Sequence, residues 1–165
     1  MIRAISTLAA AVLAVAACSP ANTGSAKATS ASAATAAAIH PISGLPVIPL
    51  TVTHVGQRHV FRVEVARSDA EQERGLMFRT TMGPDEGMIF PMNPPRNASF
   101  WMKNTVIPLD IVFIGSDHRI LNIAANAVPY SEQPLPSAGP VSGVLELNGG
   151  RAAQLGIGPG DRVDW

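Results

Sequence analysis

The most informative segment of this sequence reads Ser99-Phe100-Trp101-Met102-Lys103-Asn104-Thr105-Val106-Ile107-Pro108-Leu109-Asp110-Ile111-Val112-Phe113-Ile114. The segment is apolar at most positions, which is typical of strands that are buried on both faces. Two charged residues, Lys103 and Asp110, stand where apolar residues would be expected. If the strands on either side of their short connection pair in antiparallel fashion, the two charges face each other. An unpaired buried charge is costly, so the pair predicts either a binding site or a structural ion pair.

The residues before this segment predict short strands and one helix. Alternating apolar residues predict strands at 50–53 and 61–65, joined by a hairpin turn at Gly56-Gln57. Ser68 and Glu71 have the spacing of a capping box, which predicts a short helix that Gly75 can end. A short strand is expected at 88–90, followed by a proline-rich break at 91–95.

The residues after the segment continue the same pattern. Strands are expected at 120–123, 144–147 and 162–165, and a second short helix is expected at 151–155. The proline-rich residues 125–143 predict a long loop, which in a compact domain is usually a functional cover or mobile. The expected fold is mainly β, a compact β-sandwich or partly open barrel with two short helices.

Length and charge limit the classes of function. The 165 residues suffice for one ordinary domain with a tail, and we expect that domain at 41–165. Twelve basic residues balance twelve acidic ones, so the formal net charge is zero. A neutral chain lacks the basic surface with which proteins bind nucleic acid, and no nucleic-acid partner is expected.

The first forty residues predict export and a lipid anchor. Residues 1–17 combine a basic start with an alanine-rich apolar run, which is typical of a signal peptide and too short to span a membrane. The run ends in Val15-Ala16-Ala17-Cys18, which resembles a bacterial lipobox, so Cys18 is the expected lipidation site. Ordinary cleavage near residues 14–16, or a free thiol, is the alternative. Residues 18–40 predict a flexible tether. In a Gram-negative cell, Ser19 favours the outer membrane, facing the periplasm.

Several blocks of the domain resemble one known family, in order along the chain. They are Arg74-Gly75-Leu76-Met77-Phe78-Arg79, Asp85-Glu86-Gly87-Met88-Ile89-Phe90, Phe100-Trp101-Met102-Lys103-Asn104-Thr105, Ile107-Pro108-Leu109-Asp110, Val144-Leu145-Glu146-Leu147 and Leu155-Gly156-Ile157 with Gly160-Asp161. This pattern is similar to the domain-of-unknown-function family numbered 192, over about residues 50–163. The resemblance implies a compact β-rich fold, often exported, without a settled activity. The chain departs from the family pattern at Asn148-Gly149-Gly150, which bears on the geometry of that turn.

A polar cluster is the main candidate for chemistry. The residues proposed to bind a ligand are Arg74, Trp101, Lys103, Asn104, Asp110 and Glu146, and the candidates for catalysis are Asp110, Glu146 and Lys103. Carboxylates can accept protons, and Lys103 can bind an anion or a hydroxyl group. The alternative is a structural network of ion pairs and hydrogen bonds. Trp101 could supply a flat surface for a sugar or a peptide, although a tryptophan in an apolar strand is more often part of the core.

Methionines offer a weaker candidate for a metal site. Thioethers suit copper(I), and Met77, Met88 and Met102 are the candidates, but methionine also fills gaps in apolar cores and core packing is the expected role. No metal and no cofactor is expected. The sequence contains neither a phosphate-binding loop nor a His-Glu-x-x-His motif, which argues against the common nucleotide and zinc-protease chemistries. A binding domain rather than an enzyme is expected.

The leading hypothesis is an envelope domain that binds a small ligand or an envelope protein through Lys103, Asp110 and Glu146. The loop at 125–143 would cover this site. One alternative is a small hydrolase or lyase of envelope carbohydrate or peptidoglycan, in which Glu146 and Asp110 form the acid–base pair. A second alternative is copper handling through the methionines.

Overall fold

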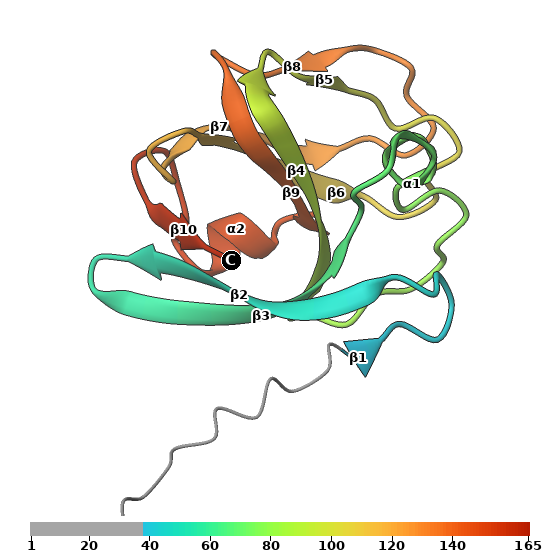
Figure 1. Cartoon of the computed structure of the whole chain (residues 1–165), viewed down its shortest axis with the longest axis horizontal. Coiled ribbons are helices and arrows are strands. Elements are labelled where there is room, and N and C mark those ends of the chain that lie inside the picture. Colours follow the sequence, from blue (N-terminus) through green and yellow to red (C-terminus); the bar gives the residue numbers. More distant parts are fainter. Residues whose placement is uncertain (1–37) are drawn as a thin grey trace, which may run out of the picture. The chain divides into compact units, whose positions relative to one another are not determined.

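The computed structural model describes residues 38–165 (Figure 1). The predicted signal peptide, Cys18 and most of the predicted tether lie outside the described residues. Strands dominate and both helices are short, which confirms the predicted mainly β fold. The elements are β1 Ala38–Ile39, β2 Pro46–His54, β3 Gln57–Val65, α1 Asp69–Arg74, β4 Glu86–Arg96, β5 Ser99–Phe100, β6 Leu109–Gly115, β7 Ile120–Ala127, β8 Leu135–Pro136, β9 Val141–Asn148, α2 Arg151–Gln154 and β10 Arg162–Asp164.

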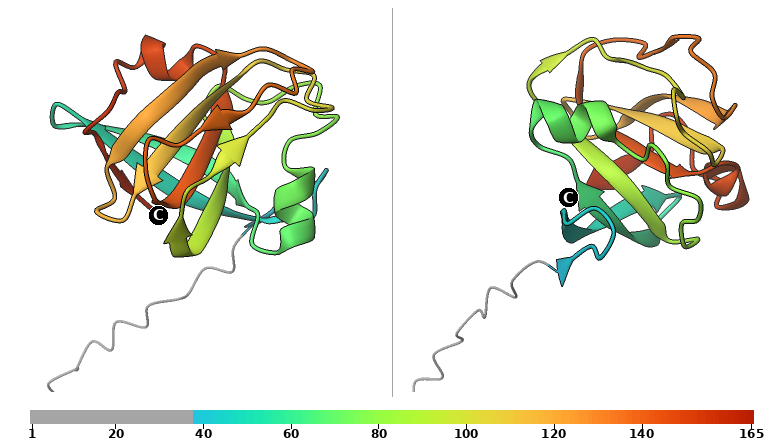
Figure 2. Two further views of the ribbon diagram at one scale, coloured as in Figure 1. Left: turned by 90° about the horizontal axis from the view of Figure 1, so that it is seen from above. Right: turned by 90° about the vertical axis from the view of Figure 1, so that its right-hand side faces the viewer.

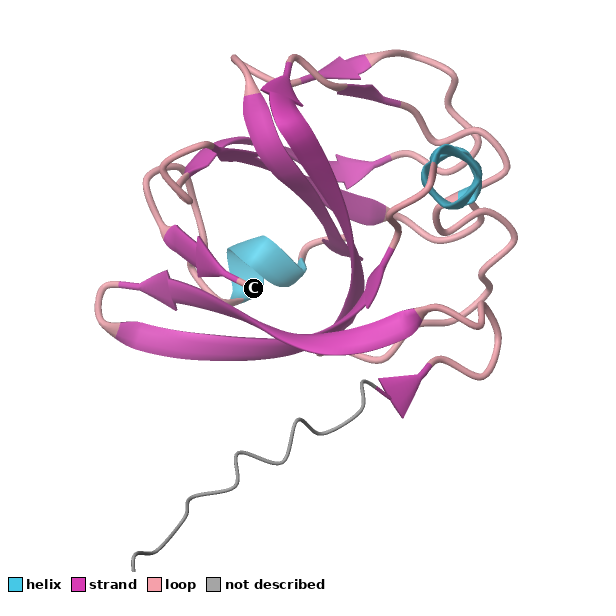
Figure 3. Ribbon diagram, viewed as in Figure 1, coloured by secondary structure: helices cyan, strands magenta, loops and turns pink. Residues whose placement is uncertain are grey.

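One large mixed sheet carries the fold. Its strands follow the order β1-β2-β3-β4-β9-β6-β7, β10 pairs with β2, and β5 and β8 form a separate two-stranded sheet. The large sheet curls until β10 approaches the turn before β7 (Figure 3). The contact there is an isolated bridge between Arg119 and Arg162, supported by the Val163 N–H, which donates to the His118 carbonyl at 2.8 Å. The sheet is therefore curled without being closed into a barrel, in agreement with the predicted partly open form.

The curled sheet separates two apolar cores. The inner face, inside the curl, carries Val112 and Ile114 of β6 together with Phe61, Leu145 and Val163. The outer face carries Leu109, Ile111 and Phe113 of the same strand, in a second core with Met88 and Met102. Side chains alternate between the faces of a strand. Strand β6, with all seven residues buried, is thus the doubly buried strand that the sequence predicted.

The predicted N-terminal hairpin is present. Strands β2 and β3 pair in antiparallel register, with Leu50 opposite Phe61 and Val52 opposite His59. Gly56 in the turn has φ of 79°, which an L side chain rarely adopts, so glycine suits this position. The hairpin begins earlier than expected, and Ala38 and Ile39, placed at the end of the tether, instead form β1 and pair with β2.

The segment at 99–114 is not a continuous pair of strands. Only Ser99 and Phe100 form β5, which pairs with β8, and residues 101–108 form a loop before β6. Asn104 has a positive φ of 55°, and its carbonyl accepts a hydrogen bond from the Phe78 N–H at 2.9 Å. The strands on either side of this connection therefore do not pair with each other, and the condition under which Lys103 and Asp110 would face each other is not met.

Two predicted irregular regions contain strands. Strand β4 continues through the expected break at 91–95, where its pairing with β9 shifts register between Pro91 and Arg96. Prolines are tolerated there because the backbone ladder is already interrupted. The expected loop at 125–143 is shortened, since β7 extends to Ala127, β8 occupies Leu135–Pro136 and β9 begins at Val141.

The two helices lie at different places on the sheet. Helix α1 lies outside the curl, whereas α2 lies across one end of it, as the two views in Figure 2 show. The capping box of α1 is formed, with the Glu71 N–H donating to Ser68 Oγ at 3.3 Å and the Ser68 N–H donating to Glu71 Oε2 at 2.8 Å. No helix among residues 38–165 is long and apolar enough to cross a membrane.

Candidate functional site

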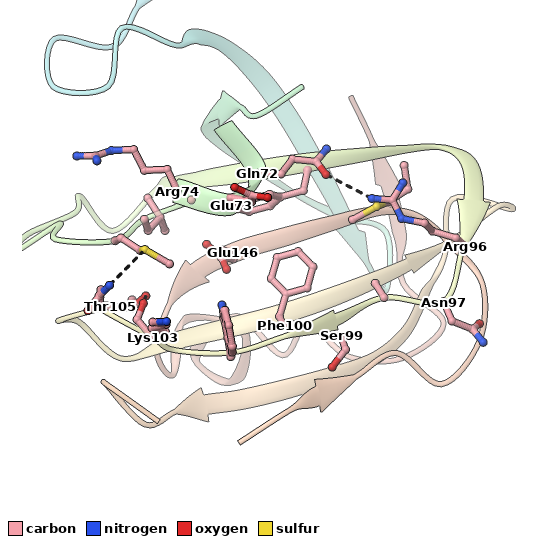
Figure 4. Close-up of a pocket in the computed structure, with 18 residues that line it drawn as sticks. Gln72, Glu73, Arg74, Arg96, Asn97, Ser99, Phe100, Lys103, Thr105 and Glu146 are labelled. Carbon is pink, nitrogen blue, oxygen red and sulfur yellow. Dashed lines mark hydrogen bonds between the residues drawn. The ribbon is translucent and has the colours of Figure 1, made fainter. Parts of the chain in front are cut away.

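A pocket of about 680 Å³ opens on the outer face of the sheet (Figure 4). One wall is α1 with the residues after it, and the opposite wall is the segment at 96–105. Phe90 and Met92 of β4 line it as well, and β9 contributes Glu146. The volume lies within the range usual for small-molecule sites. The pocket brings together five of the six predicted ligand-binding residues, namely Arg74, Trp101, Lys103, Asn104 and Glu146.

Glu146 is the buried acidic group of the pocket. Strand β9 pairs on both sides, which places Glu146 opposite Ile111 on β6 and Met88 on β4, on the apolar outer face. The residue is 5% exposed, and its Oε2 atom has no hydrogen-bond partner. Burial raises the pKa of Glu146 from 4.5 to about 8. The carboxyl group is therefore protonated at neutral pH and can donate a hydrogen bond to a ligand.

Two cations lie at one end of the pocket. Arg74 and Lys103 are both exposed, and each lies over an aromatic ring. The Arg74 guanidinium carbon is 5.8 Å from the centroid of the Phe78 ring, and Lys103 Nζ is 5.2 Å from that of Trp101. Within residues 38–165, neither cation has a carboxylate partner within ion-pair distance. Both charges are exposed to solvent at this end of the pocket, where the Arg74 side chain extends away from Glu146 (Figure 4).

Asn104 connects the two walls of the pocket. Its carbonyl accepts from the Phe78 N–H, and its Nδ2 donates to Met77 Sδ at 3.8 Å, a weak contact. Trp101 follows β5 and is 49% exposed, so this tryptophan is not part of the core. The part of the ring that Lys103 does not cover can therefore contact a ligand, as the sequence allowed.

Asp110 lies on the other face of the sheet, and its predicted pairing with Lys103 was wrong. Asp110 pairs with Leu147 on β9, whereas the neighbouring residue Ile111 pairs with Glu146. Because side chains alternate between faces, the two carboxyl groups lie on opposite sides of the sheet. Asp110 and Glu146 therefore cannot act as the acid–base pair of a hydrolase.

Asp110 instead accepts three backbone hydrogen bonds. Its Oδ1 accepts from the N–H groups of Asn126 and Gly150 at 2.8 and 2.9 Å, and its Oδ2 accepts from Ala152 N–H at 2.8 Å. Gly150 is the N-cap of α2 and has no side chain to cap the helix, so Asp110 takes this role from a distant strand. Gly150 has φ of 82°, which favours glycine. At Gly149, where the chain departs from the family pattern, an added Cβ would lie 2.9 Å from Pro108 Cβ and from Asn126 Oδ1, so the site leaves no room for a side chain.

The loop region at 125–143 does not cover the pocket, contrary to expectation, since none of its residues lines it. The residues of this region instead support the wall of the pocket that is formed by the segment at 96–105. The Met102 N–H donates to the Ser131 carbonyl at 2.8 Å, and the Tyr130 N–H donates to the Thr105 carbonyl at 3.1 Å. The segment at 101–105 is therefore held by backbone hydrogen bonds to this region.

The three candidate methionines do not converge. Met88 and Met102 are fully buried in the outer core, and only Met77 lines the pocket. Residues 38–165 contain no group of three or more His, Cys, Asp or Glu residues arranged to hold a metal ion. The burial of Met88 and Met102 supports core packing.

Several polar residues of the pocket were not predicted from the sequence, and three of them are Gln72, Glu73 and Arg96. Gln72 and Glu73 come from α1, and Arg96 comes from the end of β4. Arg96 lies at the end of the pocket away from Arg74 and Lys103 (Figure 4), and its Nη2 donates weakly to Gln72 Oε1 at 3.5 Å. No pattern marked these residues, although Glu73 precedes Arg74 directly.

Comparisons with known proteins agree with this fold. Residues 50–165 match the family described as DUF192, uncharacterized ACR. A crystal structure of a protein of unknown function from Novosphingobium aromaticivorans DSM 12444 is 65% identical, with a TM-score of 0.77, covering 80% of this chain and 94% of that one. A candidate transcription regulator from Sinorhizobium meliloti 1021 is 43% identical, with a TM-score of 0.71, covering 73% of this chain and 94% of the other. No curated protein matches the chain.

Proposed function

We propose a function for this chain from the premise that it belongs to the DUF192 family of uncharacterised proteins. The function that the site supports best is the binding of a small polar molecule in the pocket around Glu146. The observation that carries this proposal is the buried carboxyl group of Glu146, whose Oε2 has no partner inside a pocket of about 680 Å³. A buried polar atom without a partner costs stability, and a ligand that bonds to it would remove that cost.

The surroundings of Glu146 support the binding of a ligand. Phe100 and Trp101 offer aromatic surface, while Lys103 and Asn104 offer polar groups on the same wall. Apolar and aromatic walls with a few polar groups are typical of small-molecule sites. The two walls belong to segments distant in sequence, and they are connected by the hydrogen bond from Phe78 N–H to the Asn104 carbonyl.

A ligand screen tests this proposal. The purified protein is mixed with a library of metabolites, and compounds that raise its melting temperature are titrated by calorimetry. We expect Glu146→Leu to remain folded and to weaken the binding of any hit by roughly tenfold or more, because the ligand loses a buried hydrogen bond. The control is Glu132→Gln, which changes an exposed carboxylate outside the pocket. Hits that bind Glu146→Leu as tightly as wild type would refute the proposal, as would the absence of any hit.

We also propose that the chain is exported and anchored to the membrane through Cys18, facing the periplasm in a Gram-negative cell. The support is the signal-like sequence at 1–17 and the lipobox-like residues before Cys18. Residues 18–37 would then tether the domain. Metabolic labelling with a radioactive fatty acid tests this proposal. We expect label in the wild type and none in Cys18→Ser, and an unlabelled wild type would contradict lipidation.

A further inference from the structure

Arg74 and Lys103 differ from the three arginines that form ion pairs within residues 38–165. Arg79 pairs with Glu64 at 2.9 Å, and Arg151 pairs with Asp85 at 2.6 Å. Arg74 and Lys103 instead lie over aromatic rings, which leaves their N–H groups without a carboxylate in the described part of the chain. Cations of this kind bind a carboxylate through charge-assisted hydrogen bonds.

The charges that line the pocket favour an anion. Three cations line it, Arg74, Arg96 and Lys103, against two acidic residues, Glu73 and Glu146. Glu146 is neutral at pH 7, since burial raises its pKa to about 8. The pocket therefore carries an excess of positive charge at neutral pH, and this excess attracts anions and repels cations.

Glu146 favours a hydroxyl or carbonyl group at the buried part of the pocket. Its protonated carboxyl group can donate a hydrogen bond to such a group and remain neutral. An ammonium group at this place would be buried beside a neutral carboxyl group, and the burial of its unpaired charge carries a large desolvation cost. Phe100 and Trp101 on the adjacent wall provide the aromatic surface on which the apolar face of a sugar ring can pack.

We propose, on the basis of the ligand-binding function above, that the pocket is selective for a polyhydroxylated carboxylate such as a sugar acid. Its carboxylate group binds at the end of the pocket where Arg74 and Lys103 lie, and one of its hydroxyl groups bonds to Glu146. The ring packs against Phe100 and Trp101. This assignment fixes the charge of the ligand, which the proposed function leaves open.

Three related sugars test the charge of the ligand. Glucuronate, glucose and glucosamine are titrated into the purified protein by calorimetry at pH 7. Glucuronate is expected to bind about tenfold or more tightly than glucose, because charge-assisted hydrogen bonds are stronger than neutral ones. Its affinity is expected to fall with added salt, and glucosamine is expected to bind most weakly. Equal binding of glucuronate and glucose, or tighter binding of glucosamine, would overturn the inference.

Variants test the residues that we assign to the carboxylate. The double variant Arg74→Gln, Lys103→Gln should bring the affinity for glucuronate down to that for glucose, while its melting temperature stays near that of the wild type. Arg58→Gln, at an exposed arginine outside the pocket, is the matched control and should bind like wild type. Unchanged binding of glucuronate by the double variant would refute the assignment.

The outcomes separate this inference from the proposed function. If glucose or another uncharged compound binds at least as tightly as glucuronate, in a manner that depends on Glu146, the proposed ligand binding is supported and the selectivity for an anion is refuted. If no compound binds in a way that depends on Glu146, the proposed function and the selectivity for a sugar acid are both refuted. If none of the three sugars binds while an unrelated compound does, the sugar-acid assignment alone is wrong.

Discussion

Asp110 and Glu146 are buried carboxyl groups on neighbouring strands, and their surroundings are opposite. Asp110 on β6 faces α2 and accepts three backbone hydrogen bonds. Glu146 on β9 lies on the outer face, and its Oε2 has no partner. A carboxylate with several amide donors stabilises the fold around it, whereas a carboxyl group without partners destabilises it. Burial alone therefore does not identify a functional acid, and the hydrogen-bond partners of each oxygen must be counted.

The two helices show a related difference. The cap of α1 comes from Ser68, directly before the helix, with Glu71 three residues further on. The cap of α2 comes from Asp110, about forty residues earlier in the chain. One cap is therefore local and the other depends on the whole sheet.

The largest expected effect is the stability gained by Glu146→Gln at alkaline pH. The pKa of Glu146 is about 8 in the fold, against an ordinary value of 4.5. Between these values the folded state holds a proton that the unfolded chain has released, so the free energy of unfolding falls as pH rises. The full loss is about 5 kcal/mol. We expect Glu146→Gln to remove this slope in urea titrations between pH 5 and 9.

The control for this measurement is Glu132→Gln, which should keep the slope of the wild type. A wild-type free energy of unfolding that is flat across the same pH range would mean that Glu146 has a compensating partner. Asp110 and Glu146 would then both have partners for their carboxyl groups, and the difference between them would be refuted.

Asp110→Asn should lower the free energy of unfolding, by less than Glu146→Gln raises it at alkaline pH. The asparagine keeps one acceptor but directs an amide N–H toward a backbone donor, so at least one charge-assisted bond is lost. We expect a loss of about 3 kcal/mol in the free energy of unfolding, measured by urea titration at pH 7. Amide exchange of Ala152 and Gly150 should accelerate, which locates the damage at α2. An unchanged free energy would show that Asp110 is not the cap of this helix.

The smallest effect is expected at the local cap. Ser68→Ala removes the hydroxyl group that accepts from the Glu71 N–H and should cost about 1 kcal/mol. Amide exchange should accelerate within α1 and remain unchanged in α2. Faster exchange in both helices would contradict the separation of a local cap from a remote one.

The predictions from the sequence were confirmed where interactions are short in range. The hairpin of β2 and β3, the capping box of α1 and the doubly buried strand β6 all follow from patterns within a few residues. The predictions failed where distant contacts decide. Residues 101–108 form a loop because Phe78 and Ser131 hold their backbone, and β4 continues through its prolines because β9 pairs with it on either side.

The candidate site was predicted in part. Arg74, Trp101, Lys103, Asn104 and Glu146 do meet in one pocket, but Asp110 does not belong to it. The sequence shows that Lys103 and Asp110 interrupt an apolar segment, yet it cannot show which groups each of them faces. Arg96 and Gln72 were missed because nothing near them in the sequence distinguishes them from ordinary surface residues.

The mainly β class, the first hairpin and the local cap of α1 were predictable from the sequence, because each depends on residues that are close together in the chain. The family was predictable as well, from blocks that follow one another along residues 50–163. The difference between Asp110 and Glu146 follows only from the three-dimensional fold. The pairing between β4, β9 and β6 sets the surroundings of both side chains. It places the Asp110 carboxylate among the amides of α2 and leaves Glu146 Oε2 without a partner. Hydrogen bonds across a sheet join residues far apart in sequence, and no local pattern specifies them.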